Sequence, residues 1–348
     1  MINVQDVNIK VGSFFLNDIN LHVRKGEYFV IVGPTGAGKS CILNCIAGLY
    51  KIDSGDLWVD GKRSNNVPIE ERNIGYVFQD AFLFPHLNVY KNIAFGLRSR
   101  KDGSRDDVEK KISDICRLFG IYGFLDRSVY NLSGGEKQRV ALARSMICEP
   151  KAILLDEPFS SVDRNTAEKL MIEFKKIHEQ TGQTVVHVTH NQEEAMILAD
   201  RICVMNNGIL IQTGAPGEIL RKPDSEFVAD FFGAHNVFQG ISVIESDFSR
   251  IECNGNHVYC REPRSGEIVF SVRPEEVVIS LNDTRVQSRN NYSGTVKRIV
   301  DRGVIIQVFI DAGFPIVSYI FRNSLTNMGL REGDSVNIGF EESAVHII

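Results

Sequence analysis

The sequence predicts an α/β domain with a parallel sheet, followed by a small all-β barrel domain. Continuous apolar runs at residues 28–32, 152–155 and 184–189 are typical of strands that are buried on both faces. Segments of helical character separate these runs, as in a parallel sheet covered by helices. After about Gly233 short β-type runs alternate with turn residues, which is typical of a small barrel or sandwich.

The individual elements follow from the same patterns. A helix is expected to begin near Lys39, most of residues 80–150 read as helical, and a further helix is expected at about 165–180. The strands expected in the second domain are 268–272, 277–281, 294–300, 304–310, 316–320 and 335–340. We place the domains at residues 1–232 and 233–348.

The composition of the chain argues against several classes of function. The chain has 348 residues and a formal net charge of -5, and no Lys/Arg run stands out, which argues against nucleic acid as a partner. No apolar stretch approaches the roughly 18 to 20 residues that span a bilayer, and the polar N-terminus is unlike a signal peptide. Seven Cys residues without a CxxC pair fit a reducing compartment. Cys41 and Cys45 are read as a buried apolar pair rather than a metal site.

Residues 33–40, GPTGAGKS, match the G-x-x-x-x-G-K-[ST] pattern of a phosphate-binding P-loop. Glycines let the backbone approach phosphate oxygens, and the following helix directs its positive N-terminal end at the same anion. The buried strand before the motif and the helix after it make a ligand-free glycine turn the weaker interpretation. The residues expected to contact nucleotide are Gly33, Pro34, Gly36, Ala37, Gly38, Lys39, Ser40 and Cys41.

Asp156 and Glu157 directly follow the apolar run 152–155. Ligands bind at the carboxyl edge of a parallel sheet, so both carboxylates are expected beside the P-loop. Asp156 is expected to hold Mg²⁺, and Glu157 to orient and polarise the attacking water. An Asp-Glu pair alone is more often a surface turn, but together with a P-loop the functional interpretation is favoured.

Residues 132–139, LSGGEKQR, resemble the signature motif of ATP-binding cassette (ABC) proteins. Ser133, Gly134 and Gly135 are expected to begin a helix, so that their N–H groups form a second anion site. The resemblance implies an ABC-type nucleotide-binding domain with a helical subdomain, and ATP and Mg²⁺ as cofactors. It also implies a head-to-tail homodimer, in which this site closes over the γ-phosphate bound by the other subunit.

Further elements of the family occur in the expected order. Gln79 resembles the Q-loop residue, Asp163 lies in a segment that resembles the D-loop, and His190 resembles the switch histidine. The resemblance implies a catalytic set of Lys39, Gln79, Glu157 and His190, and a Mg²⁺ ligand set of Ser40, Gln79 and Asp156. The aromatic residue that usually stacks on adenine aligns with Val11, and the nearby Phe14 is our choice for that role.

The first 232 residues resemble importer ATPases with a C-terminal extension, in particular at residues 205–223 and 227–233. Residues 82–93 resemble the region that receives the coupling helix of a permease, with an ordinary amphipathic link as the alternative. The resemblance implies integral-membrane permease subunits and an external solute-binding protein as partners. It places the chain peripherally at the cytoplasmic face of the membrane. A cassette ATPase acting on ribosomes or DNA is disfavoured, because the chain has one cassette and no long heptad insertion.

Residues 285–348 resemble the molybdate-binding (Mop-type) domain, in the stretches 287–296 and 323–336. A tetrahedral oxyanion is bound by an Arg, a hydroxyl and free N–H groups in a tight loop. The oxyanion site is therefore predicted at Gln287, Ser288, Arg289 and Asn290. The sequence departs from the family at Gln287 itself, at Phe321 and at Glu341-Glu342, whose charges repel an oxyanion. A dimerising β-domain without a ligand is the alternative.

These predictions combine into one hypothesis. The chain is expected to power a membrane importer, most specifically for molybdate or tungstate, and to be inhibited when that oxyanion binds the C-terminal domain and holds the cassettes apart. Similar ATPases carry sulfate, phosphate-like anions, sugars and iron. The same ATPase serving another solute, with a purely structural C-terminal domain, therefore stays open.

Overall fold

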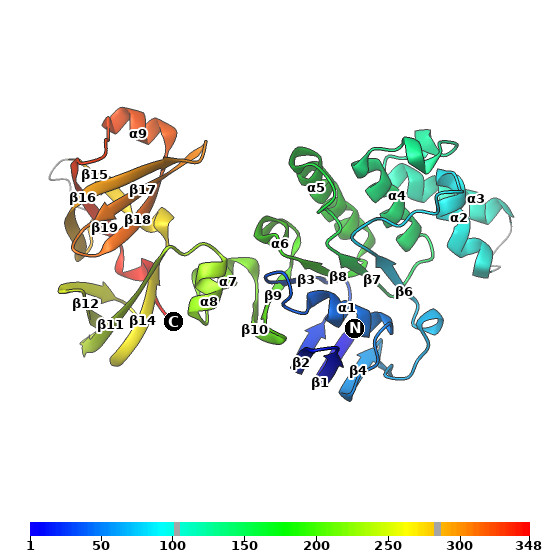
Figure 1. Cartoon of the computed structure of the whole chain (residues 1–348), viewed down its shortest axis with the longest axis horizontal. Coiled ribbons are helices and arrows are strands. Elements are labelled where there is room, and N and C mark those ends of the chain that lie inside the picture. Colours follow the sequence, from blue (N-terminus) through cyan, green and yellow to red (C-terminus); the bar gives the residue numbers. More distant parts are fainter. Residues whose placement is uncertain (101–104, 282–286) are drawn as a thin grey trace. The chain divides into compact units, whose positions relative to one another are not determined.

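A computed structural model describes residues 1–100, 105–281 and 287–348 of the chain. The chain divides into two compact units, Met1–Pro216 and Gly217–Ile348. The boundary predicted after residue 232 stays a prediction. Figure 1 shows the first unit from blue to green and the second from yellow-green to red.

A six-stranded sheet forms the centre of the first unit. All of its neighbouring strands pair in parallel except β9 and β10, which are antiparallel. Every residue of its central strand is fully buried, as expected for a parallel strand covered on both faces. In spatial order the strands are β10 (Ile209–Gly214), β9 (Arg201–Asn206), β3 (Tyr28–Val32), β8 (Thr184–Thr189), β7 (Ala152–Asp156) and β6 (Ile74–Val77).

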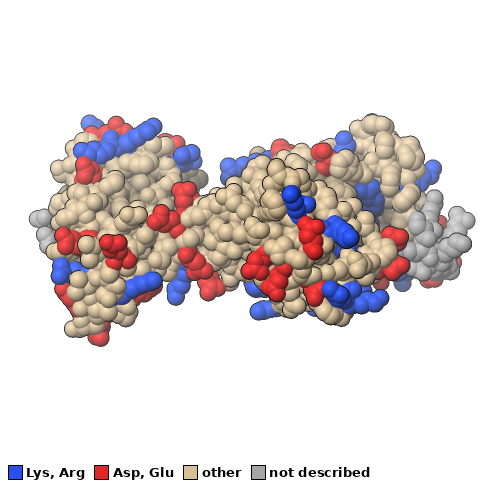
Figure 2. Space-filling model, turned by 60° about the horizontal axis from the view of Figure 1, so that its bottom comes forward, with Lys and Arg blue, Asp and Glu red and all other residues tan. Residues whose placement is uncertain are grey.

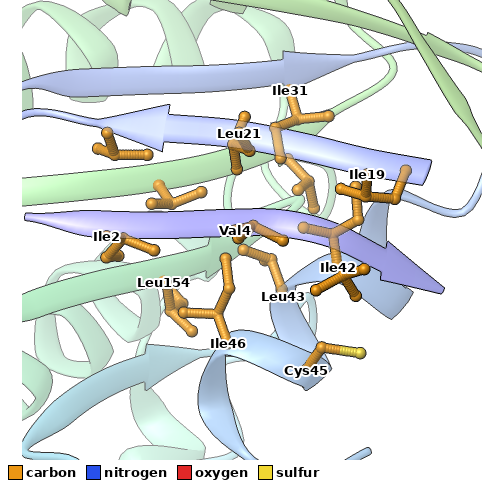
Figure 3. Packing of buried hydrophobic residues seen from close by; sticks show 14 of the residues in the cluster. Ile2, Val4, Ile19, Leu21, Ile31, Ile42, Leu43, Cys45, Ile46 and Leu154 are labelled. Carbon is orange, nitrogen blue, oxygen red and sulfur yellow. The ribbon is translucent and has the colours of Figure 1, made fainter. Parts of the chain in front are cut away.

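A second, antiparallel sheet shares its core with the central one. Its strands are β2 (Phe14–Val23), β1 (Ile2–Val11), β4 (Ser54–Val59) and β5 (Lys62–Arg63). Helix α1 (Lys39–Ala47) packs its apolar side chains, among them Ile42 and Ile46, into the same cluster as Val4 of β1 and Leu154 of β7 (Figure 3). The helix that follows the P-loop is therefore fixed to both sheets by its buried face.

The remaining helices of this unit fall into two sets. One set, α2, α3 and α4, packs together as the helical group seen in Figure 1. The other set connects strands of the central sheet. The helices are α2 (Val89–Arg100), α3 (Arg105–Leu118), α4 (Gly134–Met146), α5 (Arg164–Thr181) and α6 (Gln192–Leu198), with 3₁₀ turns at Ile69–Glu71, Tyr122–Phe124 and Val129–Asn131.

The second unit begins with two short helices, α7 (Pro216–Arg221) and α8 (Glu226–Phe231), of which α7 starts at the last residue of the first unit. Two five-stranded antiparallel sheets follow and share one hydrophobic core. The first sheet contains β11 (Asn236–Glu245), β12 (Phe248–Cys253), β13 (Asn256–Cys260), β14 (Gly266–Val272) and β20 (Val345–Ile347). The second contains β15 (Val278–Ser280), β16 (Asn290–Asp301), β17 (Ile305–Asp311), β18 (Pro315–Phe321) and β19 (Ser335–Phe340), while α9 (Arg322–Met328) and the 3₁₀ turns Pro274–Glu276 and Glu342–Ala344 lie between strands.

The predicted class, an α/β domain with a helical part followed by a small β-barrel domain, is confirmed. Strands β11, β12, β13 and β20 of the second unit were not predicted from the sequence. Helix α9, a seven-residue helix without a side-chain N-cap, was not predicted either, because its start carries no capping signal. Its end is marked by Gly329 in the left-handed conformation.

The distribution of charged side chains on the face shown in Figure 2 does not indicate a function. On the face shown in Figure 2, acidic and basic side chains are interspersed rather than gathered by sign. In the part of the chain that the structure describes, the helices lack the length and apolar character needed to span a membrane.

Arg72 is a buried cation at the end of the P-loop helix, with 6% of its surface exposed. Its guanidinium donates hydrogen bonds to the carbonyls of Cys45 and Ile46, in the last turn of α1, and to the carbonyl of Val67. A cation at a helix C-terminus satisfies carbonyls that have no partner within the helix and interacts favourably with the helix dipole. Arg72 therefore ties α1 to the segment that leads into β6.

Replacing Arg72 with Met removes these three hydrogen bonds and leaves the carbonyls of Ile46 and Val67 without this donor, while the carbonyl of Cys45 still accepts from the N–H of Gly48. We expect the free energy of unfolding of the first unit to fall by about 3 kcal/mol. Arg63→Met is the matched control, because Arg63 is exposed and pairs with the half-exposed Asp56, so its loss is expected to cost below about 1 kcal/mol. Urea unfolding followed by circular dichroism measures both values, and equal losses would contradict the role given to Arg72.

Candidate functional site

The P-loop connects β3 to α1, and two of its glycines occupy positions where no side chain fits. A Cβ on Gly33 would lie 2.1 Å from the backbone carbonyl oxygen of Met205. Gly38 has a φ of 105°, and a Cβ there would lie 2.7 Å from the ring of Phe14. The loop can therefore wrap tightly against β9 and β2 only with glycine at both places.

Lys39 is the first residue of α1 and is 5% exposed. Its ammonium donates hydrogen bonds to the carbonyl oxygens of Gly33 and Pro34, each at 2.9 Å. Burial lowers the pKa of Lys39, and the negative charges of Glu157 and Asp156 act in the opposite direction. The loop thus curves around the ammonium, which is held at the N-terminal end of α1 where an anion is favoured.

Asp156 ends β7 and meets the P-loop helix directly. One carboxylate oxygen accepts a hydrogen bond from the Ser40 hydroxyl at 2.8 Å, and the other lies 3.3 Å from the Tyr76 hydroxyl of β6. Burial raises the pKa of Asp156, partly offset by these two hydrogen bonds. A carboxylate and a hydroxyl so close together supply the hard oxygen ligands that Mg²⁺ prefers, so the residues present fit that ion.

Glu157 follows Asp156 and adopts a φ of 45°, which is uncommon for a residue other than glycine. Its backbone N–H donates to the carbonyl of Val188 on the neighbouring strand β8. One carboxylate oxygen lies 3.0 Å from Nδ1 of His190, which follows β8 and is half exposed. The backbone bend therefore aims the carboxylate at the predicted switch histidine.

A buried chain of polar groups lies beneath His190. His187, fully buried in β8, has its Nδ1 3.1 Å from the Tyr28 hydroxyl and its Nε2 3.3 Å from the carboxylate of Glu194 in α6. Burial raises the pKa of Glu194, but the neighbouring His187 and Thr189 side chains outweigh it and lower that pKa. The structure places His187 in the support of the turn that carries His190.

The signature residues lie in a different group. Ser133 is the N-cap of α4: its hydroxyl accepts from the N–H of Glu136, and the Glu136 carboxylate accepts from the N–H of Ser133. Gly135 packs so closely that a Cβ would lie 2.8 Å from Thr166 of α5. Gly134 lines a cavity of about 390 Å³ together with residues of the segment after Gln79.

The structure thus brings most of the predicted catalytic and metal-binding residues to one edge of the central sheet. Lys39, Ser40, Asp156, Glu157 and His190 all lie at the carboxyl ends of β3, β7 and β8. Gln79 is exposed two residues beyond Val77, which pairs in register with Leu155 of β7. Asp163 caps α5 by accepting from the N–H of Thr166 at 3.1 Å.

The adenine position is the least defined part of this site. Phe14 is half buried against the core, and its ring lies against Gly38 of the P-loop. The ring of Phe15 is 47% exposed, with the ammonium of Lys10 5.1 Å from its centroid. The stacking role assigned to Phe14 stays a prediction.

Tyr76, whose hydroxyl contacts both Asp156 and Asn44, was not singled out from the sequence. A tyrosine in an apolar strand carries no signal of its own. Its contact with the carboxylate depends on the pairing of β6 with β7.

The predicted oxyanion residues lie together in the second unit, but many of their polar groups are already engaged. The Ser288 hydroxyl donates to the carbonyl of Phe340, and the backbone N–H of Arg289 donates to the Glu342 carboxylate at 3.0 Å. The Asn290 amide bonds both the N–H and the carbonyl of Tyr259. Asn290 therefore holds two strands together, and the oxyanion prediction rests on Gln287, Ser288 and Arg289.

The Arg289 guanidinium itself lies over two aromatic rings, 4.2 Å from the centroid of Phe248 and 5.5 Å from that of Tyr259. Such stacking holds the cation while leaving its edge N–H groups directed outward. Glu342 bears out the concern that an acidic residue faces this loop, since its carboxylate takes the N–H of Arg289. An oxyanion bound here would compete with that carboxylate.

Comparison with known proteins agrees with this geometry. Residues 16–160 match the family described as ABC transporter, and residues 270–348 match the family described as TOBE domain. The chain is 38% identical to the molybdate/tungstate import ATP-binding protein WtpC of Pyrococcus abyssi, over 100% of both chains. It is 34% identical to the spermidine/putrescine import ATP-binding protein PotA of Mesoplasma florum, over 97% of this chain and 94% of that one.

Among solved structures, the first unit is similar to the ATP-binding cassette MJ0796, whose dimeric post-hydrolysis state was determined with ADP and Pi. The two are 32% identical with a TM-score of 0.55, covering 62% of this chain and 99% of that one. CbiO1 of Clostridium perfringens, part of the transporter complex CbiONQ, gives 29% identity and a TM-score of 0.59, covering 63% and 89%.

Replacing Glu157 with Gln keeps the size of the side chain and removes its charge. We expect ATP hydrolysis to fall by at least about a hundredfold, because the group that polarises water is lost, while the affinity for ATP is retained. Glu179→Gln, at an exposed position of α5, is the control and is expected to hydrolyse ATP normally. Steady-state hydrolysis and equilibrium nucleotide binding measure the two effects, and substantial turnover by Glu157→Gln would refute the assigned role.

Proposed function

The chain belongs to the ATP-binding subunits of ABC importers that carry a C-terminal TOBE domain, and on that premise we propose that it drives the uptake of molybdate or tungstate. As such a subunit, it hydrolyses ATP. The proposal concerns the solute, the residues that perform the chemistry, the partners and the regulation. Each is supported by a different part of the molecule.

The chemistry is phosphoryl transfer to water, in which positioning and charge stabilisation do most of the catalysis. We assign the phosphates to the P-loop N–H groups and to Lys39, whose ammonium sits at the N-terminus of α1. Ser40, Asp156 and Gln79 would hold Mg²⁺, which neutralises phosphate charge when bound. The Glu157 carboxylate orients and polarises the water, and His190, 3.0 Å from it, holds that carboxylate in place and faces the γ-phosphate.

A second copy of the chain completes the site in this proposal. Ser133, Gly134 and Gly135 form the N-terminus of α4, where N–H groups and the helix dipole favour an anion. They belong to the helical group rather than to the carboxyl edge of the sheet. We propose that they close over the γ-phosphate held by the partner subunit, giving a homodimer with two ATP molecules.

The remaining partners follow from the family. We propose that the dimer docks on integral-membrane permease subunits at the cytoplasmic face of the membrane, and that an external solute-binding protein delivers the solute. The cavity lined by Phe82, Leu83 and Pro85 lies in the region assigned to the permease's coupling helix. Nucleic acid is not among the proposed partners.

The choice of solute rests on one observation, the similarity to WtpC along the entire length of both chains. This similarity includes the second unit, where the Arg289 guanidinium lies over the ring of Phe248. A polyamine importer is the second candidate, because the similarity to PotA is nearly as extensive. The two solutes carry opposite charges, so they are readily distinguished.

We further propose that the oxyanion inhibits the ATPase from inside the cell. An oxyanion at Ser288 and Arg289 would displace the Glu342 carboxylate from the Arg289 N–H. Inhibition requires that the ligand bind more tightly when the two cassettes are apart, since a ligand shifts an equilibrium only by its difference in affinity for the two states.

Calorimetry of the full chain with molybdate, tungstate, sulfate and spermidine tests the proposal. We expect molybdate and tungstate to bind, and Arg289→Gln to weaken that binding about tenfold, the loss expected for one charge-assisted hydrogen bond. Arg322→Gln is the control. Arg322 pairs with Asp301 away from this loop, and the substitution removes the same charge as Arg289→Gln. Binding of spermidine alone favours the polyamine candidate, and the absence of any binding contradicts regulation by an oxyanion.

A further inference from the structure

The segment after Gln79, residues 80–87, joins two parts of the first unit. It begins just beyond β6 of the central sheet and ends at α2 of the helical group. Gln79 stands at its start, at the edge where the phosphate-binding residues lie. A movement of Gln79 relative to the helical group would therefore change the conformation of this segment.

Arg144 of α4 fastens the start of this segment to the helix that carries the signature motif. Its guanidinium donates hydrogen bonds to the carbonyls of Ala81, at 3.1 Å, and Phe82, at 3.0 Å. It also lies over the ring of Phe84, 5.2 Å from the centroid. Burial of the guanidinium lowers the pKa of Arg144, as expected for a cation enclosed by the backbone it binds. The fixed fork of a guanidinium can bind two successive carbonyls, which an ammonium cannot do with the same geometry.

Asn92 of α2 fastens the end of the same segment. This side chain is fully buried, and its amide oxygen accepts from the N–H of Phe84 at 2.8 Å. The amide nitrogen donates to the carbonyls of Phe84 and Leu87. Because α2 and α4 pack on each other, both attachments hold the segment to one body.

The segment also faces the start of α4. A cavity of about 390 Å³ is lined by Asp80, Ala81 and Phe82 on one side and by Gly134, Lys137 and Ser161 on the other. The residues just after Gln79 thus line the same cavity as the N-terminus of the signature helix, while Arg144 binds the segment farther along that helix.

We propose that Arg144 is a positioning residue for ATP hydrolysis, which locks the segment after Gln79 to the signature helix. When Gln79 engages the nucleotide, α4 and its Ser133 end move with it into the position that closes over the phosphate of the partner subunit. In this proposal Arg144 acts through the carbonyls of Ala81 and Phe82 and the ring of Phe84, not by contact with the reacting groups. This role rests on the proposed dimer and is independent of which solute is carried.

Arg144→Gln in the full chain tests the inference. We expect kcat for ATP hydrolysis to fall about tenfold, because the two halves of the site no longer close together. KM for ATP is expected to stay within about twofold, because the P-loop contacts are untouched. Amide hydrogen exchange over residues 81–87 should rise, and Arg144→Lys should fall between Arg144→Gln and the wild type in kcat.

Arg117→Gln is the matched control. Arg117 also lies over an aromatic ring in the helical group, 5.0 Å from the centroid of Tyr122, but does not touch the segment. A kcat of Arg144→Gln equal to that of Arg117→Gln overturns the inference. So does a parallel change of KM, kcat and the unfolding midpoint in both Arg144 variants, which would mark a purely structural residue.

ATP-dependent dimerisation of Glu157→Gln, measured by light scattering, separates this inference from the proposed dimer. We expect Glu157→Gln to dimerise with ATP, and the double variant with Arg144→Gln to need about tenfold more protein to do so. If Glu157→Gln and the double variant dimerise equally well, the inference about Arg144 is wrong while the proposed dimer stands. If Glu157→Gln stays monomeric with ATP, the proposed dimer fails and the inference fails with it.

Discussion

The parallel, in-register pairing of β3, β8 and β7 determines where the candidate site lies. Val32 lies opposite Thr189, and Asp156 opposite Val188, so the residues that follow these strands emerge at one edge. The strands are buried on both faces, and the polar side chain of His187 within β8 pairs internally with Tyr28 and Glu194. The P-loop, both carboxylates and His190 lie at the strand ends.

This constraint explains what could be predicted from the sequence. A motif residue at the end of an apolar run has its position set by the sheet, so the P-loop pattern and the apolar run 152–155 were enough to predict where Lys39 and Asp156 lie. His190 was assigned by its resemblance to the switch histidine of the family. Tyr76 and Arg144 could not be found in this way. Their roles depend on the particular carboxylate or carbonyl that they meet across the fold, and neither residue is unusual in its own segment.

The second unit also shows what could not be predicted from the sequence. Its class was predictable from short β-type runs, but the state of the oxyanion loop was not, because Glu342 and Phe340 reach Ser288 and Arg289 from more than fifty positions away in the chain. Hydrogen bonds of this kind decide whether a loop that resembles a binding motif has donors to offer. Binding to this loop must replace an internal carboxylate, which makes the affinity for an oxyanion a difference between two interactions.

In the proposed site, ATP is held between the P-loop of one chain and the signature motif of another. Mixing Lys39→Ala with Ser133→Arg tests this arrangement, since each variant alone lacks one half of every site. We expect hydrolysis by the mixture to rise well above that of either variant, up to about a quarter of wild type, because half of the dimers then hold one intact site. A mixture no more active than its components would contradict a site shared between two chains.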